Sequence, residues 1–271
     1  MKKILQLITI FTLIITLISC KSASEDTIKV IATTTPHGEI LEFARDLLEE
    51  KGFQLEIIIT SDYYFPNPAV SAGDADANFF QHVPFLDKYN TENPNSQLSI
   101  GAYVHIEPIG IYSNNYNNVS EIEDGATVLI SNSTSDHGRV LNLFQSAGLI
   151  TIKEGVDITS PTLIIQDAIE TNPKNLVFSA NVSPDFLFAA YTNEEADLYV
   201  INSNYVLEGG NNPVTESIFI EDTANNPYVN ILAVKESDLS SPKILALIEI
   251  LQSEAVQDFI NATYNGSVIP A

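Results

Sequence analysis

Cysteine is almost absent from this sequence. Cys20 is the only cysteine among the 271 residues. With no second thiol an intrachain disulfide is excluded, so the fold must rely on a hydrophobic core, which a chain of this length is able to form.

Positively charged residues are also scarce. The chain has 12 Lys and Arg against 35 Asp and Glu, which gives a formal net charge of −23. A surface this acidic favours solubility and nearly excludes nucleic acid as a partner. Only two arginines occur, Arg45 and Arg139, so each of them is conspicuous.

The N-terminal apolar run is too short for a membrane-spanning helix. Ile4–Ile18 has about 15 residues, whereas such a helix needs about 20. The run follows Lys2 and Lys3, and a basic start before a short apolar stretch is typical of a secretory signal. We therefore predict that residues 1–19 are a signal peptide and that the protein is exported.

The single cysteine stands at the end of this run. Leu17-Ile18-Ser19-Cys20 resembles the lipobox of bacterial lipoproteins, in which the cysteine is lipidated and becomes the new N-terminus. The resemblance implies lipidation of Cys20, a lipidated tether over residues 20–26, and a lipid-anchored location at the cell membrane, facing the periplasm or the cell exterior. A chance cysteine at the end of the signal is the alternative.

Strand and helix patterns alternate after the tether. Residues 27–33 are rich in β-branched side chains and predict a strand, residues 38–51 repeat apolar side chains at helical steps, and residues 53–60 predict a second strand. Such a βαβ unit implies a parallel sheet covered by helices. Later patterns predict strands at residues 101–106, 110–113, 126–131, 176–179, 197–202, 217–221 and 228–234, and helices at residues 83–89, 136–147, 161–170, 184–191 and 242–264.

The mature chain is too long for one comfortable core, so we predict two α/β lobes. We place the first crossing near the Asn-rich residues 113–120 and the return near residues 225–228. Lobe I then comprises residues 27–118 and 228–271, and lobe II residues 119–227. Two lobes joined by two crossings are able to close on a ligand by hinge bending.

Several sequence motifs point to one protein family. The most specific is Asn78-Phe79-Phe80-Gln81-His82, which follows the commoner Gly73-Asp74-Ala75-Asp76-Ala77. Other stretches occur in order along the chain: Pro36–Leu41, Ser61–Tyr63, Glu107–Ser113, Gly138-Arg139, Val200–Tyr205, Pro227–Asn230 and Val268–Ala271. Together these motifs resemble those of the NlpA-type, methionine-binding lipoproteins of ABC importers.

The resemblance implies an α/β, two-lobed, periplasmic-binding-protein-like fold of type II, with mixed, mostly parallel sheets and the ligand cleft between the lobes. It also implies that the protein captures L-methionine and delivers it to an ABC permease with ATPase subunits. The chain has no Gly-x4-Gly-Lys-[Ser/Thr] loop for a nucleotide, and we expect neither enzyme activity nor a cofactor.

A free amino acid needs a cation for its carboxylate, and Arg139 is the candidate. We expect Arg139 in the first turn of a helix that begins near Ser135-Asp136, where anions are attracted. A guanidinium holds a carboxylate with two parallel hydrogen bonds. A surface salt bridge with nearby Asp136 or another acid is the alternative, and the match to the family's Gly-Arg pair favours ligand binding.

Aromatic side chains near a strand-to-helix turn predict the wall for the ligand side chain. The resemblance implies that Tyr63, Phe80 and His82 line this slot, while Phe79, which alternates with Phe80, faces the core. Aromatic rings contact a thioether favourably, which suits methionine. Phe85 stands where the family usually has a tyrosine, and fine specificity depends on whether that position contacts the ligand.

Amides supply the remaining polar contacts. Asn202, Asn204 and Asn230 are predicted at or just after strand ends, where an amide oxygen is able to accept from the ammonium and an amide nitrogen to donate to the carboxylate. Asparagine in loops is often only a turn residue. The resemblance assigns these positions to the ligand, and spacing does not choose between Asn202 and Asn204.

Other functions stay open at this point. The same fold is able to bind a methionine-containing dipeptide, D-methionine or another apolar amino acid, since one methylene changes binding by only about 1 to 3 kcal/mol. His37, His82, His105 and His137 form a metal site only if the fold brings them together, because their spacing has no ligand signature, so we expect no metal. A lipoprotein without a transport role is the third class.

Overall fold

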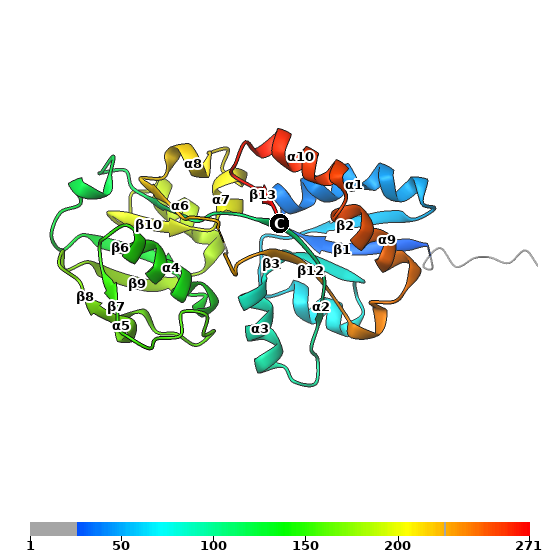
Figure 1. Cartoon of the computed structure of the whole chain (residues 1–271), viewed down its shortest axis with the longest axis horizontal. Helices are drawn as coiled ribbons and strands as arrows, with labels where there is room; N and C mark the ends of the chain where they lie inside the picture. The colour runs from blue at the N-terminus through cyan, green and yellow to red at the C-terminus, as the bar shows by residue number, and fades with distance from the viewer. Residues whose placement is uncertain (1–25, 225) are drawn as a thin grey trace, which may run out of the picture.

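The computed structural model describes residues 26–224 and 226–271 (Figure 1). The predicted signal peptide, Cys20 and nearly all of the tether lie outside these residues. The described part folds into two α/β lobes, each built around its own sheet, as predicted.

The sheet of lobe I has the strand order β13-β4-β12-β3-β1-β2. Helices α1, α9 and α10 cover one face of it, and α2 and α3 cover the other. The elements of this lobe are β1 (Thr27–Ala32), α1 (Glu39–Glu50), β2 (Gln54–Ile59), α2 (Pro66–Ala72), β3 (Ala77–His82), α3 (Val83–Glu92), β4 (Ser99–Ile106), β12 (Asn230–Val234), α9 (Pro242–Leu251), α10 (Glu254–Tyr264) and β13 (Ile269–Pro270).

The sheet of lobe II has the order β11-β5-β10-β6-β9. Helices α4 and α5 cover one face, and α6 and α7 pack on the other. Its elements are β5 (Gly110–Tyr112), β6 (Thr127–Ser131), α4 (Thr134–Ser146), α5 (Ile165–Ala168), β9 (Val177–Val182), α6 (Leu187–Thr192), β10 (Leu198–Ile201), α7 (Ser203–Glu208), α8 (Pro213–Glu216) and β11 (Phe219–Ile220). Strands β7 (Thr151–Ile152) and β8 (Ile169–Thr171) form a separate two-stranded antiparallel sheet.

The βαβ unit at the N-terminus is confirmed, because β1 pairs in parallel with both β2 and β3. The expectation that the sheets are mostly parallel is wrong. Among the described residues the two sheets contain four parallel and five antiparallel strand pairs. The strands nearest the crossings, β5 and β12, run antiparallel to their neighbours because each enters from the other lobe.

The first crossing lies earlier than predicted. Strand β5 pairs with β10 and β11, so it belongs to lobe II, and the chain changes lobes between β4 and β5, at residues 107–109. The Asn-rich residues 113–120 form an exposed loop after β5, so their composition marks solvent contact rather than a change of lobe. The return lies between β11 and β12, which includes the predicted residues 225–228.

Two helix predictions also need correction. The predicted helix 242–264 is divided into α9 and α10 at Gln252 and Ser253, where the Ser253 hydroxyl accepts a hydrogen bond from the backbone of Val256 and caps the second helix. The predicted helix 161–170 is reduced to α5, and residues 169–171 form strand β8, which pairs with β7. Serine is a common helix N-cap residue, but the apolar stripe continues past Ser253 without interruption and therefore predicted a single helix.

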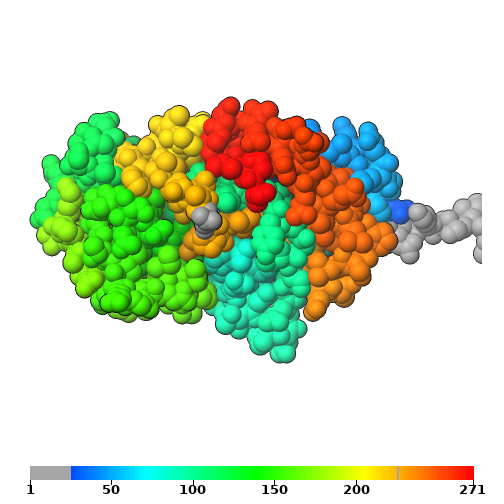
Figure 2. Space-filling view, viewed as in Figure 1, coloured from blue at the N-terminus to red at the C-terminus, as the bar shows by residue number. Residues whose placement is uncertain are grey.

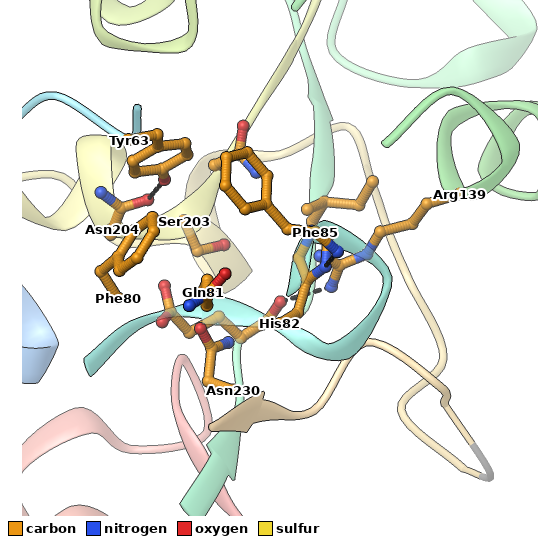
Figure 3. A pocket seen from close by; sticks show the side chains of 12 residues that line it. Tyr63, Phe80, Gln81, His82, Phe85, Arg139, Ser203, Asn204 and Asn230 are labelled. Carbon is orange, nitrogen blue, oxygen red and sulfur yellow. Dashed lines mark hydrogen bonds between the residues drawn. The ribbon is translucent and has the colours of Figure 1, made fainter. Parts of the chain in front are cut away.

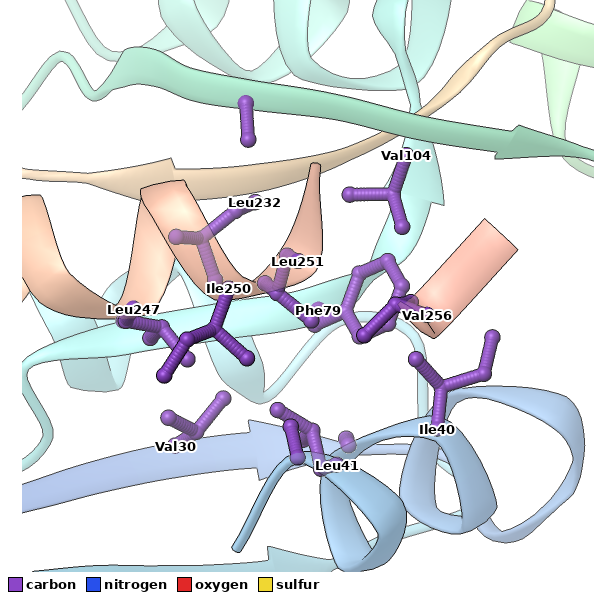
Figure 4. Close-up of a cluster of buried hydrophobic side chains, with 14 of the residues drawn as sticks. Val30, Ile40, Leu41, Phe79, Val104, Leu232, Leu247, Ile250, Leu251 and Val256 are labelled. Carbon is purple, nitrogen blue, oxygen red and sulfur yellow. The ribbon is translucent and has the colours of Figure 1, made fainter. Parts of the chain in front are cut away.

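The core of lobe I lies between its sheet and the three helices above it (Figure 4). Phe79 from β3 is fully buried there, beside Val30 of β1 and Leu251 of α9, so its assignment to the core is correct. Burial of a side chain of this size contributes about 1.5 to 3 kcal/mol. This packing fixes β3 in place, and the pocket residues that follow Phe79 along the strand are fixed with it.

The lobes contact one another directly (Figure 2). Hydrogen bonds join Tyr205 Oη to the carbonyl of Ser61 at 2.8 Å, and Ser267 Oγ to Asn212 Oδ1 at 3.1 Å. Each bond joins a residue of one lobe to a residue of the other. The structure is therefore a closed arrangement of the two lobes.

Candidate functional site

A pocket of about 360 Å³, counting the part that opens to solvent, lies where the two lobes meet (Figure 3). Both lobes contribute to the wall, as expected for a cleft between them. All eight predicted ligand residues line the pocket: Tyr63, Phe80, His82, Phe85, Arg139, Asn202, Asn204 and Asn230. Four further residues also line it: Gln81, Glu107, Ile109 and Ser203.

An aromatic wall is built from three neighbouring segments of lobe I. Tyr63 follows β2, Phe80 lies on β3, and Phe85 lies in the first turn of α3. The ring of Phe85 meets those of Tyr63 and Phe80 edge-on, with centroids 5.9 and 5.7 Å away. Edge-to-face pairs of this kind are favourable, and they leave ring surface for a ligand.

A β-bulge directs Phe80 toward the pocket. In the pairing of β3 with β12, Phe79 lies opposite Leu232 and Gln81 opposite Ile231, so Phe80 has no partner of its own. Such an extra residue bends the strand locally and redirects its side chain. The bulge places Phe80 in the wall while Phe79 stays in the core.

His82 joins the two lobes at the floor of the pocket. Its Nδ1 accepts from the backbone N–H of Phe85 and caps α3, while its Nε2 lies 2.7 Å from Oδ1 of Asp136 in lobe II. Burial alone would raise the pKa of Asp136, but the hydrogen bond and charge of His82, with the charge of Arg139, hold that pKa below its usual value. Asp136 is therefore an ionised, buried partner of His82.

Arg139 lies in the second turn of α4, not the first, because the helix begins at Thr134. Its side chain is 3% exposed, and its Nε and Nη2 both bond to the carboxylate of Glu221 at 2.6 to 3.0 Å. Nη2 also donates to the carbonyl of Glu107 at 2.6 Å, and the Tyr228 ring lies below the guanidinium at 4.8 Å. Arg139 thus forms a buried salt bridge with Glu221 and not the surface salt bridge considered as the alternative, and it also lines the pocket.

The three asparagines differ in what they offer. Asn204 is 2% exposed, and its Oδ1 accepts from Tyr63 Oη at 2.5 Å, while its buried Nδ2 has no partner among the described residues. Asn202 is half-buried and donates to Asp136 at 3.5 Å. Asn230 Oδ1 lies 3.1 Å from His37 Nε2. An unpartnered buried amide is costly, so Asn204 is the one prepared to donate to a ligand.

The sequence reasoning did not single out Glu107. This carboxyl is 5% exposed, and its Oε1 lies 2.8 Å from His105 Nε2 and 3.3 Å from His37 Nε2. Burial raises the pKa of Glu107, and it lowers the pKa of His37 to about 4 and that of His105 to about 3. Two signals were available: Glu107 begins the stretch Glu107–Ser113 that matches the family, and it directly follows β4, the last lobe I strand before the crossing.

Only two of the four histidines come together. Within residues 26–224 and 226–271, one group of metal-ligand type was found, formed by His37, His105 and Glu107, with its ligand atoms within 4.8 Å of one another. His82 pairs with Asp136, and His137 bonds to two backbone carbonyls. The four-histidine site considered from the sequence is therefore not formed.

The sequence and the fold both match known proteins. The family of NlpA lipoproteins matches residues 28–271. The methionine-binding lipoprotein MetQ of Bacillus subtilis is 43% identical over 243 residues, covering 90% of this chain and 87% of that protein. The D-methionine-binding lipoprotein MetQ of Escherichia coli is 32% identical, covering 93% of this chain and 92% of its own length.

A solved structure of a nutrient-binding protein from Burkholderia cenocepacia, bound to methionine, has a TM-score of 0.82 and 30% identity. The match covers 90% of this chain and 99% of the Burkholderia cenocepacia chain. The two-lobed type II fold is thereby confirmed, and the matching proteins are named for binding rather than for a reaction, in agreement with the expectation that the chain is not an enzyme. This chain belongs to the NlpA lipoprotein family.

Proposed function

We propose that this protein captures L-methionine outside the cytoplasm and delivers it to an ABC permease. The observation that carries the proposal is the set of side chains that line one pocket between the lobes. Arg139 and the free Nδ2 of Asn204 suit a carboxylate, and the rings of Tyr63, Phe80 and Phe85 suit a thioether. The methionine-binding names of the relatives agree with this chemistry.

The closed lobes support the delivery step. Contacts between the lobes lie directly beside the pocket, since Tyr63 bonds to Asn204 and His82 to Asp136. A ligand that touches both walls stabilises this closed form over an open one. A permease that binds both lobes at once would then distinguish loaded from empty protein.

Attachment to the membrane is the second part of the proposal. The family consists of lipoproteins, and we propose that Cys20 carries the lipid. Helices long and apolar enough to cross a membrane were not found among residues 26–224 and 226–271. Mass spectrometry of protein purified from membranes tests this: an acylated N-terminus at Cys20 is expected, and an unmodified Cys20 within an uncut chain would contradict it.

D-methionine, a methionine-containing dipeptide and other apolar amino acids are the alternatives. Calorimetric titration of the full-length protein in detergent, after unfolding and refolding to remove carried-over ligand, separates them. We expect tight binding of L-methionine and weaker binding of D-methionine, glycyl-methionine and leucine. Equal binding of glycyl-methionine would favour a peptide role, and no heat with any of the four would remove the methionine proposal.

A further inference from the structure

We infer that a second cavity, behind the aromatic wall of the pocket, receives the outer part of longer ligand side chains. The protein therefore also takes free amino acids whose thioether sulfur carries an apolar group larger than methyl, and Phe85 controls entry. This inference rests on the proposed function and defines the range of ligands that the same site accepts. The rear cavity measures about 370 Å³, counting the part that opens to solvent, and lies between α3 and the loop that follows β2.

A single layer of aromatic rings separates the rear cavity from the first pocket. Tyr63 and Phe85 line both spaces. Their rings meet edge-on with centroids 5.9 Å apart, and the two side chains are 8% and 9% exposed. A ligand side chain in the first pocket therefore has to pass only one ring to reach the rear cavity.

Phe85 is the movable half of this partition. The Tyr63 hydroxyl donates to Oδ1 of Asn204 in lobe II, so closure of the lobes holds that ring. Phe85 has no polar side-chain atom. Its backbone N–H donates to His82 Nδ1 at 3.2 Å, which fixes the Cβ position and leaves the side-chain torsions free. Its ring is held by contacts with other rings, among them Tyr64 at 6.2 Å. Rotation of Phe85 alone would therefore join the two spaces.

The lining of the rear cavity suits an apolar group. Four aromatic rings surround it, those of Tyr63, Tyr64, Phe85 and Tyr89. Within residues 26–224 and 226–271, none of the residues that line it has a buried polar side-chain atom without a partner. Such a space makes no demand for hydrogen bonds, and hydrocarbon enters it without leaving a polar group unpaired.

The polar side chains of this lining are already paired. Asn67 is 1% exposed, and its Nδ2 donates to Gln81 Oε1 at 2.9 Å while its Oδ1 accepts from Asn78 at 2.9 Å. Lys88 and Glu92 form an ion pair with each other. A charged group would have to break one of these pairs to bind here. The charged end of the ligand therefore stays in the first pocket, and only its apolar end extends.

The rear cavity belongs to lobe I alone. Its lining comes from the loop after β2, from α2 and from α3, whereas both lobes build the first pocket. A group that extends into the rear cavity does not separate the lobes. A long side chain directed out of the cleft would instead prevent the contacts that close it, such as that between His82 and Asp136. A ligand extended through the partition is thus compatible with the closed form.

The first test compares L-methionine with S-butyl-L-homocysteine, which has three more methylenes on the sulfur. Both are titrated calorimetrically into the full-length protein in detergent, after unfolding and refolding to remove carried-over ligand. Each methylene buried in the rear cavity raises affinity about fourfold, which offsets displacement of the Phe85 ring. We expect the two affinities to agree within tenfold. Binding of the butyl compound that is weaker by more than tenfold would overturn the inference.

The second test locates the butyl group in a crystal structure of the wild-type complex. Its terminal carbon should lie against Tyr64 and Tyr89, which line the rear cavity and not the first pocket. The Phe85 ring should be turned away from Tyr63. A butyl group that leaves through the cleft between the lobes would overturn the inference even if the compound binds tightly.

The third test removes the partition. Phe85→Ala should raise the affinity for S-butyl-L-homocysteine relative to L-methionine at least tenfold. Phe80→Ala is the matched control, because it deletes a ring of the same size that lines the first pocket and not the rear cavity. That variant should weaken binding of both compounds and keep their ratio. Equal changes of the ratio in both variants would place the butyl group in the first pocket and overturn the inference.

The outcomes separate this inference from the proposed function. A wild type that binds L-methionine and rejects the butyl compound would remove the inference alone. A wild type that does not bind L-methionine would remove the proposed function, and the inference with it. Circular dichroism establishes whether Phe85→Ala is folded. If it is not folded, the crystal structure of the wild-type complex decides, since that measurement needs no substitution.

Discussion

The hydroxyl of Tyr63 donates to Oδ1 of Asn204 across the boundary between the lobes. This bond occupies the carbonyl side of the amide, so the nitrogen is the side left for the pocket, where it has no partner among the described residues. One phenol in lobe I therefore sets which end of an amide in lobe II faces a ligand.

Replacement of Tyr63 by phenylalanine should weaken methionine binding about 2- to 10-fold, because one neutral hydrogen bond contributes about 0.5 to 1.5 kcal/mol. Titration calorimetry measures the change. Ser267→Ala is the control, since its hydroxyl also joins the lobes but bonds to Asn212 and contacts neither Tyr63 nor Asn204. Equal losses in both variants would show that the bond acts on closure alone and not on the orientation of Asn204.

Replacement of Arg139 should lower both the unfolding free energy and the affinity for methionine, and a second replacement, at Glu221, should restore only the unfolding free energy. Arg139→Met leaves Glu221 buried without its partner and should cost about 3 to 5 kcal/mol of unfolding free energy. Adding Glu221→Leu removes the unpaired acid and should restore most of that loss, while methionine affinity stays at least tenfold below wild type. Urea unfolding and calorimetry measure the two effects. Wild-type affinity in the double variant would exclude Arg139 as the carboxylate partner.

Phe80 should discriminate the sulfur of methionine from a methylene. Contacts between sulfur and an aromatic ring contribute about 0.3 to 1.5 kcal/mol, so Phe80→Leu should reduce the preference for methionine over norleucine by about 2- to 10-fold. Phe79→Leu is the matched control on the opposite side of β3, where the ring belongs to the core. That variant should lower stability and keep the preference. A preference unchanged by Phe80→Leu would place the thioether elsewhere.

The two buried histidines should make the ligand-free protein sensitive to mild acid. Their pKa values of about 4 and 3 lie below the ordinary 6.5, so the unfolded chain takes up protons that the folded protein does not. Stability is therefore fully present above about pH 6.5 and falls as the pH decreases toward 4. The raised pKa of Glu107 acts with the opposite sign. His105→Phe should flatten the dependence of unfolding free energy on pH, and an unchanged slope would contradict this reading.

Gly138 should not tolerate a side chain. A Cβ there would lie 1.6 Å from the carbonyl oxygen of Ile158, which is backbone and unable to yield easily. Gly138→Ala should lower the urea midpoint strongly, whereas Gly101→Ala, whose Cβ would meet its nearest atom at an ordinary 3.4 Å, should change it little. Similar midpoints for the two variants would show that the loop containing Ile158 moves freely.

The sequence predicted the pocket better than the path of the chain. Tyr63, Phe80, His82 and Arg139 come from three separate segments and line one pocket, because the family motifs marked strand ends that the fold gathers at the lobe junction. The lobe change at residues 107–109 was missed, since a short turn between two strands looks the same whether the next strand pairs in the old sheet or in a new one.

The sequence also did not predict which charged side chains would pair with one another. Glu221 lies 82 positions from Arg139, and His37 lies 70 positions from Glu107, so no local pattern connects them. The chain has 35 acidic residues, and composition does not indicate which of them lose contact with water. Pairing of this kind is decided by the tertiary fold.

The crossing segment at residues 107–109 is also part of the pocket wall. Glu107 and Ile109 line the pocket, and the carbonyls of Glu107 and Pro108 accept from Arg139 and Ser203. One of the two segments that must bend when the lobes separate therefore also lines the pocket. Ligand fit and the angle between the lobes would therefore change together. A solute that fits the pocket imperfectly would leave the two lobes at a different angle, and a membrane partner sensitive to that angle would reject the complex even where the solute binds tightly.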